Sequence, residues 1–147
     1  MRVLIAQLGT PSRWGQFSPH FEIVRDYFGA EPDEHLQISL RAVSALGHIG
    51  PVEDRVSIPK DSKNWSFELG EAGKDQYPED GARPVVVFLR RNDGSYVYSV
   101  LMPEDPPFGA ISGYLVENSK GPAREIPQVI TSEAQLRALW PNSPLLN

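Results

Sequence analysis

Side chains that can contact a nucleic acid gather in the polar segment 55–65. Its last six positions hold two lysines, an asparagine and a tryptophan, namely Lys60, Lys63, Asn64 and Trp65. An apolar run that predicts a strand follows further along the chain. A loop that a sheet holds in place, and that carries such side chains, is a common means of reaching into a nucleic-acid groove. This segment is therefore the first candidate for a binding site.

A catalytic interpretation of the same segment is weaker. Pro32-Asp33 followed by Asp61-Ser62-Lys63 superficially matches metal-dependent nucleases, in which two carboxylates hold magnesium and a lysine helps to activate water. Such a lysine normally belongs to an apolar strand, whereas this stretch is wholly polar, so we expect no catalytic residue. We also expect no metal site and no other cofactor, because no acid stands at ligand spacing from the three histidines, His20, His35 and His48.

The composition fits one globular domain that spans residues 1–147. Of the 147 residues, 40% are hydrophobic and 22% are charged, which suffices for one core but not for two. The chain has no cysteine, which excludes disulfides, thiol nucleophiles and cysteine-based zinc sites. Its formal net charge of -5 argues mildly against DNA, because phosphate contacts favour a basic protein. A protein that recognises bases in a DNA groove needs only a local basic surface, so DNA is not excluded as a partner.

The sequence also bears on location. It contains no apolar run that approaches the roughly 20 residues of a membrane helix. The opening segment 1–7 is too short for a signal peptide and leads directly into polar residues. We therefore expect a cytoplasmic protein without membrane association.

Most of the chain shows the patterns of strands. Asn92, Asp93 and Gly94 tolerate a positive φ, which predicts a hairpin between two apolar runs. The fold class is therefore mainly β (α+β). Short apolar or alternating runs predict seven strands, at 2–8, 36–40, 55–59, 65–69, 85–91, 95–102 and 111–116.

Two short helices are expected beside the strands. Ser18 at the cap and Pro19 at the first helical position predict a helix over 19–28. Ser132 and Gln135 form a capping box for a second helix near the end of the chain. These elements together predict a seven-stranded open β-barrel with two short helices.

The order of these elements resembles the B3-type DNA-binding pseudobarrel. Plant B3 domains share a helix after a Ser-Pro-like pair and a Val-x-Phe-x-Arg strand, which here would be Val85-Val-Val-Phe-Leu-Arg90. Closer in layout is the N-terminal effector domain of EcoRII-type restriction endonucleases. In that domain a basic loop runs into a tryptophan, and an acidic turn with a glycine precedes the apolar strand. The corresponding pieces here are 60–65 and Tyr77-Pro-Glu-Asp-Gly81.

The resemblance implies two arms that enter the major groove of double-stranded DNA from both sides. By position, the first arm is residues 9–20 and the second arm is residues 55–65. Arginine can pair bidentately with guanine, glutamine and asparagine can pair with adenine, and serine and lysine can hold phosphates. The residues expected to contact DNA are Ser12, Arg13, Trp14, Gln16 and His20 in the first arm, and Arg55, Lys60, Asp61, Ser62, Lys63, Asn64 and Trp65 in the second.

Some of these residues have a simpler interpretation. Trp14 and Trp65 are more often packing aromatics than base contacts, because tryptophan tends to be buried. Asp61 departs from the basic arms of the family, since it would repel phosphate unless it accepts from a cytosine amino group. The second arm is also less basic than in the effector domains.

The resemblance implies sequence-specific DNA binding as the effector or recognition domain of a restriction endonuclease. The nuclease activity would lie on another, linked domain, and the bound sequence would be similar to the family's CC(A/T)GG. The alternative is a small β-barrel enzyme or ligand-binding protein. Its pocket would lie inside the barrel and be lined by Phe88, Tyr96, Tyr98 and Tyr114.

Overall fold

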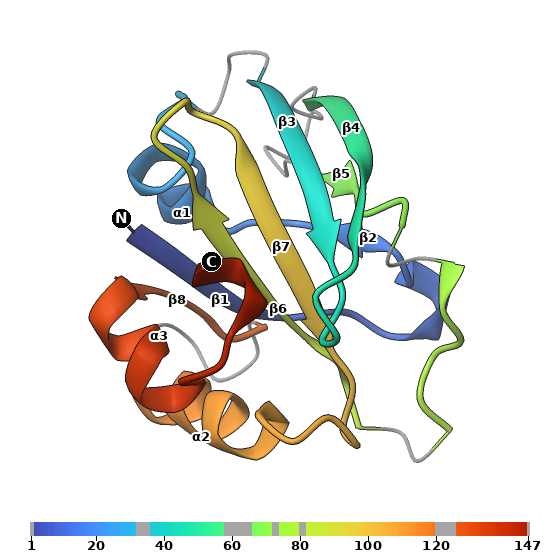
Figure 1. Cartoon of the computed structure of the whole chain (residues 1–147). Coiled ribbons are helices and arrows are strands. Elements are labelled where there is room, and N and C mark those ends of the chain that lie inside the picture. The colour runs from blue at the N-terminus through green and yellow to red at the C-terminus, as the bar shows by residue number, and fades with distance from the viewer. Residues whose placement is uncertain are drawn as a thin grey trace.

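An open, mixed sheet of six strands forms the centre of the protein (Figure 1). The computed structural model describes residues 2–31, 36–57, 66–71, 74–79, 82–119 and 126–146. The strands are β1 (Arg2–Gln7), β2 (Gln16–Phe17), β3 (Leu36–Val43), β4 (Ile49–Ser57), β5 (Phe67–Glu68), β6 (Val85–Arg90), β7 (Tyr96–Leu101) and β8 (Gln128–Ser132). The central order is β4-β3-β7-β6-β1-β8, and β2 pairs with β5 in a second sheet.

The described helices lie on both sides of this sheet (Figure 1). α2 and α3 cover one face, and α1 lies with the small β2-β5 sheet on the other. Within the described ranges, no helix combines the length and the apolar character that a membrane span requires. The helices are α1 (Phe21–Asp26), α2 (Phe108–Asn118), α3 (Glu133–Leu139) and the short 3-10 helices η1 (Pro11–Arg13) and η3 (Pro144–Leu146).

The sheet topology confirms the mainly β class but not the barrel. Neighbouring strands of the large sheet run antiparallel except for β3 and β7, which run parallel. β4 and β8 remain at opposite edges, so the sheet is not closed. Seven strands were expected, whereas the described ranges contain eight in two sheets.

Two local signals were confirmed by the structure. The β6-β7 hairpin turns where Asn92, Asp93 and Gly94 predicted it, with Gly94 at a φ of 87° and its N–H donating to the Arg91 carbonyl at 3.0 Å. Ser132 caps α3, because its Oγ accepts from the Gln135 N–H at 3.1 Å. Both signals depend on neighbours in the sequence, which explains why the sequence predicts them.

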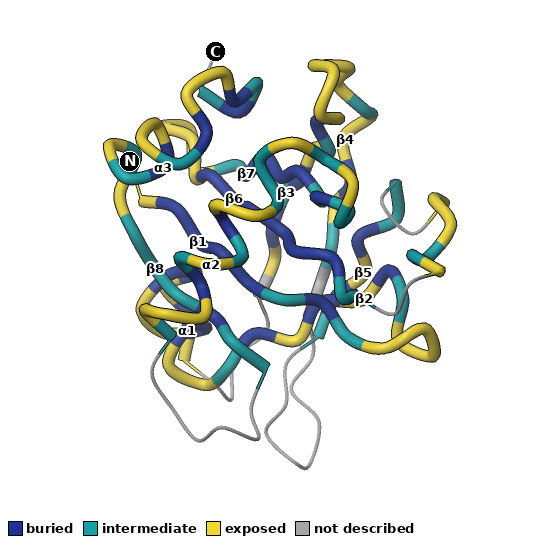
Figure 2. Tube along the Cα trace, turned by 90° about the horizontal axis from the view of Figure 1, so that it is seen from below, coloured by how far each residue is buried: buried dark blue, intermediate teal, exposed yellow. Residues whose placement is uncertain are grey.

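The central strands are buried on both faces (Figure 2). Along β6, Val86 and Phe88 point into a core rich in aromatic rings, while Val87 and Leu89 point into a second core beneath α2 and α3. We call the first the aromatic core. It contains closely packed rings, such as Phe17 and Phe88 with their centroids 5.1 Å apart. A strand that is buried on both faces has a continuous apolar sequence, as β6 has.

The four residues of the alternative interpretation do not form one interior pocket. Phe88, Tyr96 and Tyr98 are buried in the aromatic core, where Phe88 and Tyr98 lie 5.7 Å apart. Tyr114 lies on α2, against the other core, with its hydroxyl 2.9 Å from Thr131 Oγ1. These four side chains therefore line no common cavity.

The expected strand over 111–116 is wrong, because this segment belongs to α2. Gly109 and Gly113 weaken the helical signal, since glycine costs roughly 1 kcal/mol relative to alanine inside a helix. Ile111 and Leu115 lie one helical turn apart and are fully buried. Tertiary burial of this pair stabilises the helix that the local sequence disfavours.

Several other boundaries differ from the expected ones. α1 begins at Phe21 after the cap residue His20, so Ser18 is not the cap and Pro19 is not the first helical residue. Tyr27 follows α1 in the aromatic core, where burial raises the pKa of its hydroxyl; the hydroxyl stays protonated and donates to the Arg2 carbonyl at 3.3 Å. The strands β2 and β8 were not expected, and β4 starts earlier than the expected strand over 55–59.

The burial of Leu115 beneath α2 can be tested by the free energy of unfolding of variants. Replacing buried Leu115 by alanine should lower the free energy of unfolding by about 2–5 kcal/mol, because the change leaves a cavity under the helix. The matched change of its neighbour Val116 to alanine, at a side chain that is 67% exposed, should change it by less than about 0.5 kcal/mol. Urea unfolding measures both variants, and equal losses would contradict this burial.

Candidate nucleic-acid interface

The first arm, residues 9–20, joins β1 to α1 through a short 3-10 turn. η1 ends at Arg13, and Gly15 follows with a φ of 83°, a left-handed conformation that favours glycine. The chain then enters β2. The Leu69 N–H donates to the Gly15 carbonyl at 2.7 Å, so the segment after β5 holds the turn in place.

Trp14 supports the first arm from within the protein. Its Nε1 donates to the Asp75 carbonyl at 2.7 Å, and its ring meets Tyr77 edge-on with centroids 5.4 Å apart. The Tyr77 hydroxyl donates to the Gly9 carbonyl at 2.9 Å. These contacts support the packing interpretation of Trp14, and a contact between Trp14 and DNA stays a prediction.

Gln128 on β8 anchors the other end of the first arm. Its Oε1 accepts from the backbone N–H of His20 at 2.8 Å, and its Nε2 donates to the Ser18 carbonyl at 2.9 Å. Gln128 is buried, and these two bonds satisfy its side-chain amide. The half-buried His20 is therefore fixed through its backbone.

Arg13 and Gln16 line one small hollow between these two anchors. The hollow has a volume of about 50 Å³, and both side chains are exposed. Gln7, the last residue of β1, lines the same hollow and was missed because it belongs to the strand rather than to the loop. Ser12 is exposed on η1, with its Oγ 3.1 Å from Thr10 Oγ1. The structure thus brings together two expected contact residues and adds the side-chain amide of Gln7.

Most of the second arm falls outside the described residues. Arg55 is described, and its guanidinium faces the protein: Nε donates to the Glu68 carbonyl at 3.1 Å and Nη2 to Glu53 Oε1 at 3.1 Å. Its role as a DNA contact stays a prediction. The expected residues outside the described ranges are Lys60, Asp61, Ser62, Lys63, Asn64 and Trp65 of the arm, together with Pro32, Asp33 and His35.

Glu53 organises the base of the second arm. This carboxylate is only 6% exposed, and its Oε1 accepts from Arg55 and from the Gly70 N–H at 2.7 Å. Its Oε2 accepts from the Tyr98 hydroxyl at 2.6 Å. A buried carboxylate is tolerated when it is paired and fully hydrogen-bonded, as here. The network links β4, which precedes most of the arm, to β7 and to Gly70 in the segment after β5.

The two arms share one support. β2, within the first arm, pairs antiparallel with β5, which follows the second arm; Gln16 lies opposite Glu68 and Phe17 opposite Phe67. The rings of Phe17 and Phe67 lie 5.5 Å apart in the aromatic core. In the described part of the chain, no group of three or more histidine, aspartate or glutamate side chains is placed to hold a metal ion.

Comparisons with known proteins identify the fold. No family model matches the sequence, and a search of curated proteins finds no match. The structure is similar to the N-terminal domain of Helicobacter pylori LlaJI.R1, with a TM-score of 0.62 and 8% identity over 90% of this chain and 99% of that chain. A second similar structure is the UbaLAI restriction endonuclease B3 domain with cognate DNA, with a TM-score of 0.49 and 13% identity over 88% of this chain and 86% of that chain. The chain has a B3-like fold, which confirms the resemblance seen in the sequence.

The hydrogen bonds around Glu53 can be tested by substituting Gly70. A Cβ on Gly70 would lie 2.8 Å from both Arg55 Nη2 and Glu53 Oε1, so Gly70→Ala must displace this ion pair of the half-buried Arg55 with the buried Glu53. We expect a loss of about 1–3 kcal/mol in the free energy of unfolding, as for a broken buried hydrogen bond. Gly109→Ala is the control, since nothing lies within 4 Å of its added methyl group in α2, and it should be neutral or stabilising. Urea unfolding compares the two, and an unaffected Gly70→Ala variant would contradict the network.

Proposed function

We propose that this chain binds double-stranded DNA sequence-specifically, with its first and second arms entering the major groove from two sides. One observation carries the proposal: Arg13 and Gln16, on an arm anchored at both ends, line a single hollow beside Gln7. The B3-like fold supports it, because the DNA-binding family that the sequence resembles uses two such arms. Specificity requires donors and acceptors held side by side, which this arrangement provides.

Each arm has a distinct set of expected contacts. In the first arm, Arg13 would pair with guanine and Gln16 with adenine, each contributing about 1–3 kcal/mol of discrimination between bases. Ser12 would hold a phosphate. In the second arm, Asn64 would read adenine while Lys60 and Lys63 hold phosphates.

The first arm and the base of the second arm are held before DNA arrives. Trp14 and Gln128 fix the first arm, and Glu53 with Arg55 fixes the base of the second. An arm that is already ordered loses less conformational entropy on binding than a free loop. We therefore assign Trp14, Arg55 and Gln128 primarily to positioning.

The net charge of -5 predicts a modest dependence on salt. The arms offer three cations for phosphates or bases, Arg13, Lys60 and Lys63, besides the internally bonded Arg55. Because Arg13 is assigned to guanine, Lys60 and Lys63 remain for phosphates, and the logarithm of the binding constant should fall against the logarithm of salt concentration with a slope of about -2. The binding energy would then come mainly from base contacts.

In its cellular role, the chain would be a single recognition domain of a restriction endonuclease that acts in the cytoplasm. It would have no catalytic residue of its own, and the nuclease would lie on a linked domain. By the resemblance, its site would be similar to CC(A/T)GG. The Asp33 and Lys63 pattern would then have no catalytic role.

The proposal is tested by selecting duplexes from a randomised pool and measuring binding by fluorescence anisotropy at two salt concentrations. Arg13→Ala and Asn64→Ala should each weaken binding to the selected duplex by roughly five- to 150-fold and relax the preference at one position. Arg41→Ala is the matched control, because Arg41 is exposed on β3, outside both arms. Failure to select any duplex would refute the proposal, as would equal losses for Arg41→Ala and Arg13→Ala.

A further inference from the structure

Two exposed arginines near the β6-β7 hairpin have no internal partner. Arg41 lies on β3, and Arg91 follows β6 directly. Among the described residues, no hydrogen bond or ion pair engages either guanidinium group. Arginine presents a planar set of donors that matches a carboxylate, and it is weakly hydrated for a cation. This pair is therefore open to an anionic group from outside the chain.

The strand register places both arginines on one face of the sheet. Arg41 lies opposite Val97 of β7 and opposite Val52 of β4. Val97 belongs to the core beneath α2 and α3, as does Leu89, two residues before Arg91. Side chains at every second position of a strand share a face, and so do directly opposite residues. The arginines and Val52 thus lie on the α2/α3 face, opposite the aromatic core.

A cavity of about 300 Å³ joins the two arginines on this face. Arg41 and Arg91 line it together with Val52 and Val97. Val97 is only 1% exposed and gives the cavity a fixed wall, whereas Val52 is 45% exposed at its rim. A guanidinium group beside apolar surface attracts an anion more strongly than one surrounded by water, because the local dielectric constant is lower. We call these four residues the arginine cavity.

Asp93 limits the negative charge that the arginine cavity can accept. It lines the same cavity, and its Oδ1 accepts from the Ser95 N–H at 2.9 Å and from Ser95 Oγ at 2.6 Å. These hydrogen bonds lower the pKa of the Asp93 carboxyl, so it stays ionised at neutral pH. Two arginines and one carboxylate leave one positive charge, and Asp54 is exposed nearby on β4, opposite Ser39. A single carboxylate fits this balance better than the many phosphates of a duplex.

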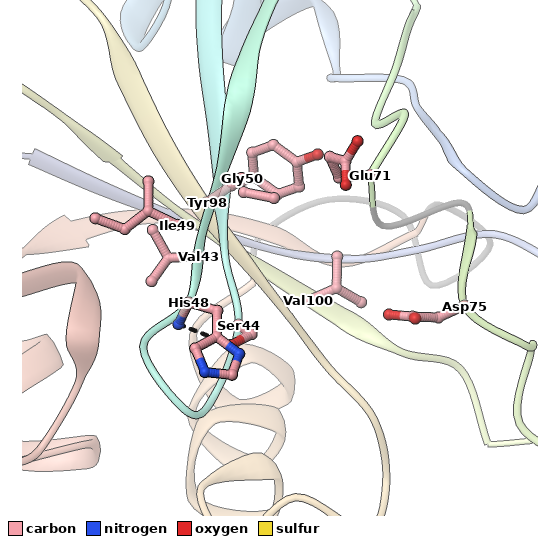
Figure 3. Close-up of a pocket in the computed structure, with 10 residues that line it drawn as sticks. Val43, Ser44, His48, Ile49, Gly50, Glu71, Asp75, Tyr98 and Val100 are labelled. Atoms are coloured by element: carbon pink, nitrogen blue, oxygen red, sulfur yellow. Dashed lines mark hydrogen bonds between the residues drawn. The ribbon is translucent and has the colours of Figure 1, made fainter.

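Exposed apolar surface continues from the arginine cavity along β4. Ile49 lies opposite Val43, which belongs to the core beneath α2 and α3, and the pairing shifts register between Ile49 and Val52. The shift leaves both side chains on the same face. Ile49 is 61% exposed. The turn before it is fixed, because the His48 N–H donates to Ser44 Oγ at 3.0 Å (Figure 3).

We propose that this face docks a polypeptide segment of a partner protein, with a glutamate or aspartate side chain between Arg41 and Arg91 and an apolar side chain on Val52 and Ile49. Charge complementarity favours an acidic segment, because the two guanidinium groups are unpaired in the described structure. A free carboxylic acid would leave Ile49 uncovered. The first arm packs β2 into the aromatic core, on the other face of the sheet, so the docking face is separate from that arm.

The test follows amide resonances of the full 15N-labelled chain by NMR, in about 0.15 M salt, which screens distant charges. The acidic probe is a peptide of about eight residues that alternates glutamate with leucine. Four further probes are the same peptide with lysine for glutamate, the same peptide with serine for leucine, free glutarate, and a duplex of random sequence. We expect saturable shifts at residues 39–41, 49–52 and 91–97 with the acidic probe. Binding of the other four at these residues should be weaker by about ten-fold or more.

Variants separate this site from general charge attraction. Arg41→Glu together with Arg91→Glu should weaken the acidic probe by about ten-fold or more and strengthen the lysine peptide, because the charge of the cavity is reversed. Val52→Ser should weaken the acidic probe as well. The matched controls are Arg25→Glu on α1 and Val116→Ser on α2, which remove exposed side chains of the same types and should leave binding unchanged.

The proposal is overturned if the acidic probe gives no saturable shift at these residues, or if glutarate, the serine peptide or the random duplex binds there equally well. It is also overturned if a control variant weakens binding as much as the arginine variants, or if sedimentation shows that this face joins two copies of the chain. Arg41→Ala should weaken the acidic probe and leave binding to the selected duplex unchanged, so a failure of DNA binding would leave these outcomes unaffected.

Discussion

The buried carboxylate of Glu53 is the constraint on which the proposed interface depends. One oxygen binds Arg55 and the Gly70 N–H, and the other binds the Tyr98 hydroxyl, so β4, β7 and the segment after β5 meet at one residue. A buried charge is costly when unpaired, so the surrounding chain is held where all three donors converge. This requirement holds β4, which leads into the second arm, beside the segment that follows β5.

The aromatic core transmits the same constraint to the first arm. Phe17 and Phe67 face each other across the β2-β5 pair and pack on Phe88 of the central sheet. β2 belongs to the first arm and β5 follows the second arm, so this small sheet ties the first arm to the segment after the second. Hydrogen bonds of the Trp14 and Gln128 side chains hold the two parts of the first arm in place. Two arms on one rigid support are well suited to a duplex whose groove has a fixed width.

Local signals in the sequence predicted local structure, and long-range contacts explain the failures. The turn at Gly94 and the cap at Ser132 were predicted correctly, whereas α2 was missed because Ile111 and Leu115 stabilise it only through tertiary burial. Arg13 and Gln16 were proposed from residue type, and the structure shows that they share a hollow. The role of Gln128 could not be predicted, since its partners lie 108 and 110 residues away. β8 did carry a signal, the β-branched run of Val129, Ile130 and Thr131.

The most direct test of a two-armed DNA interface is to map the bound duplex on the 15N-labelled chain by NMR. With a duplex selected from a random pool, the largest amide shifts should fall at residues 9–20 and 55–65, with smaller ones at the same positions for an unselected duplex. The amides of α2 and α3, across the sheet, should be unaffected. The largest shifts on α2 or α3, or identical patterns for the two duplexes, would contradict a two-armed, sequence-specific interface.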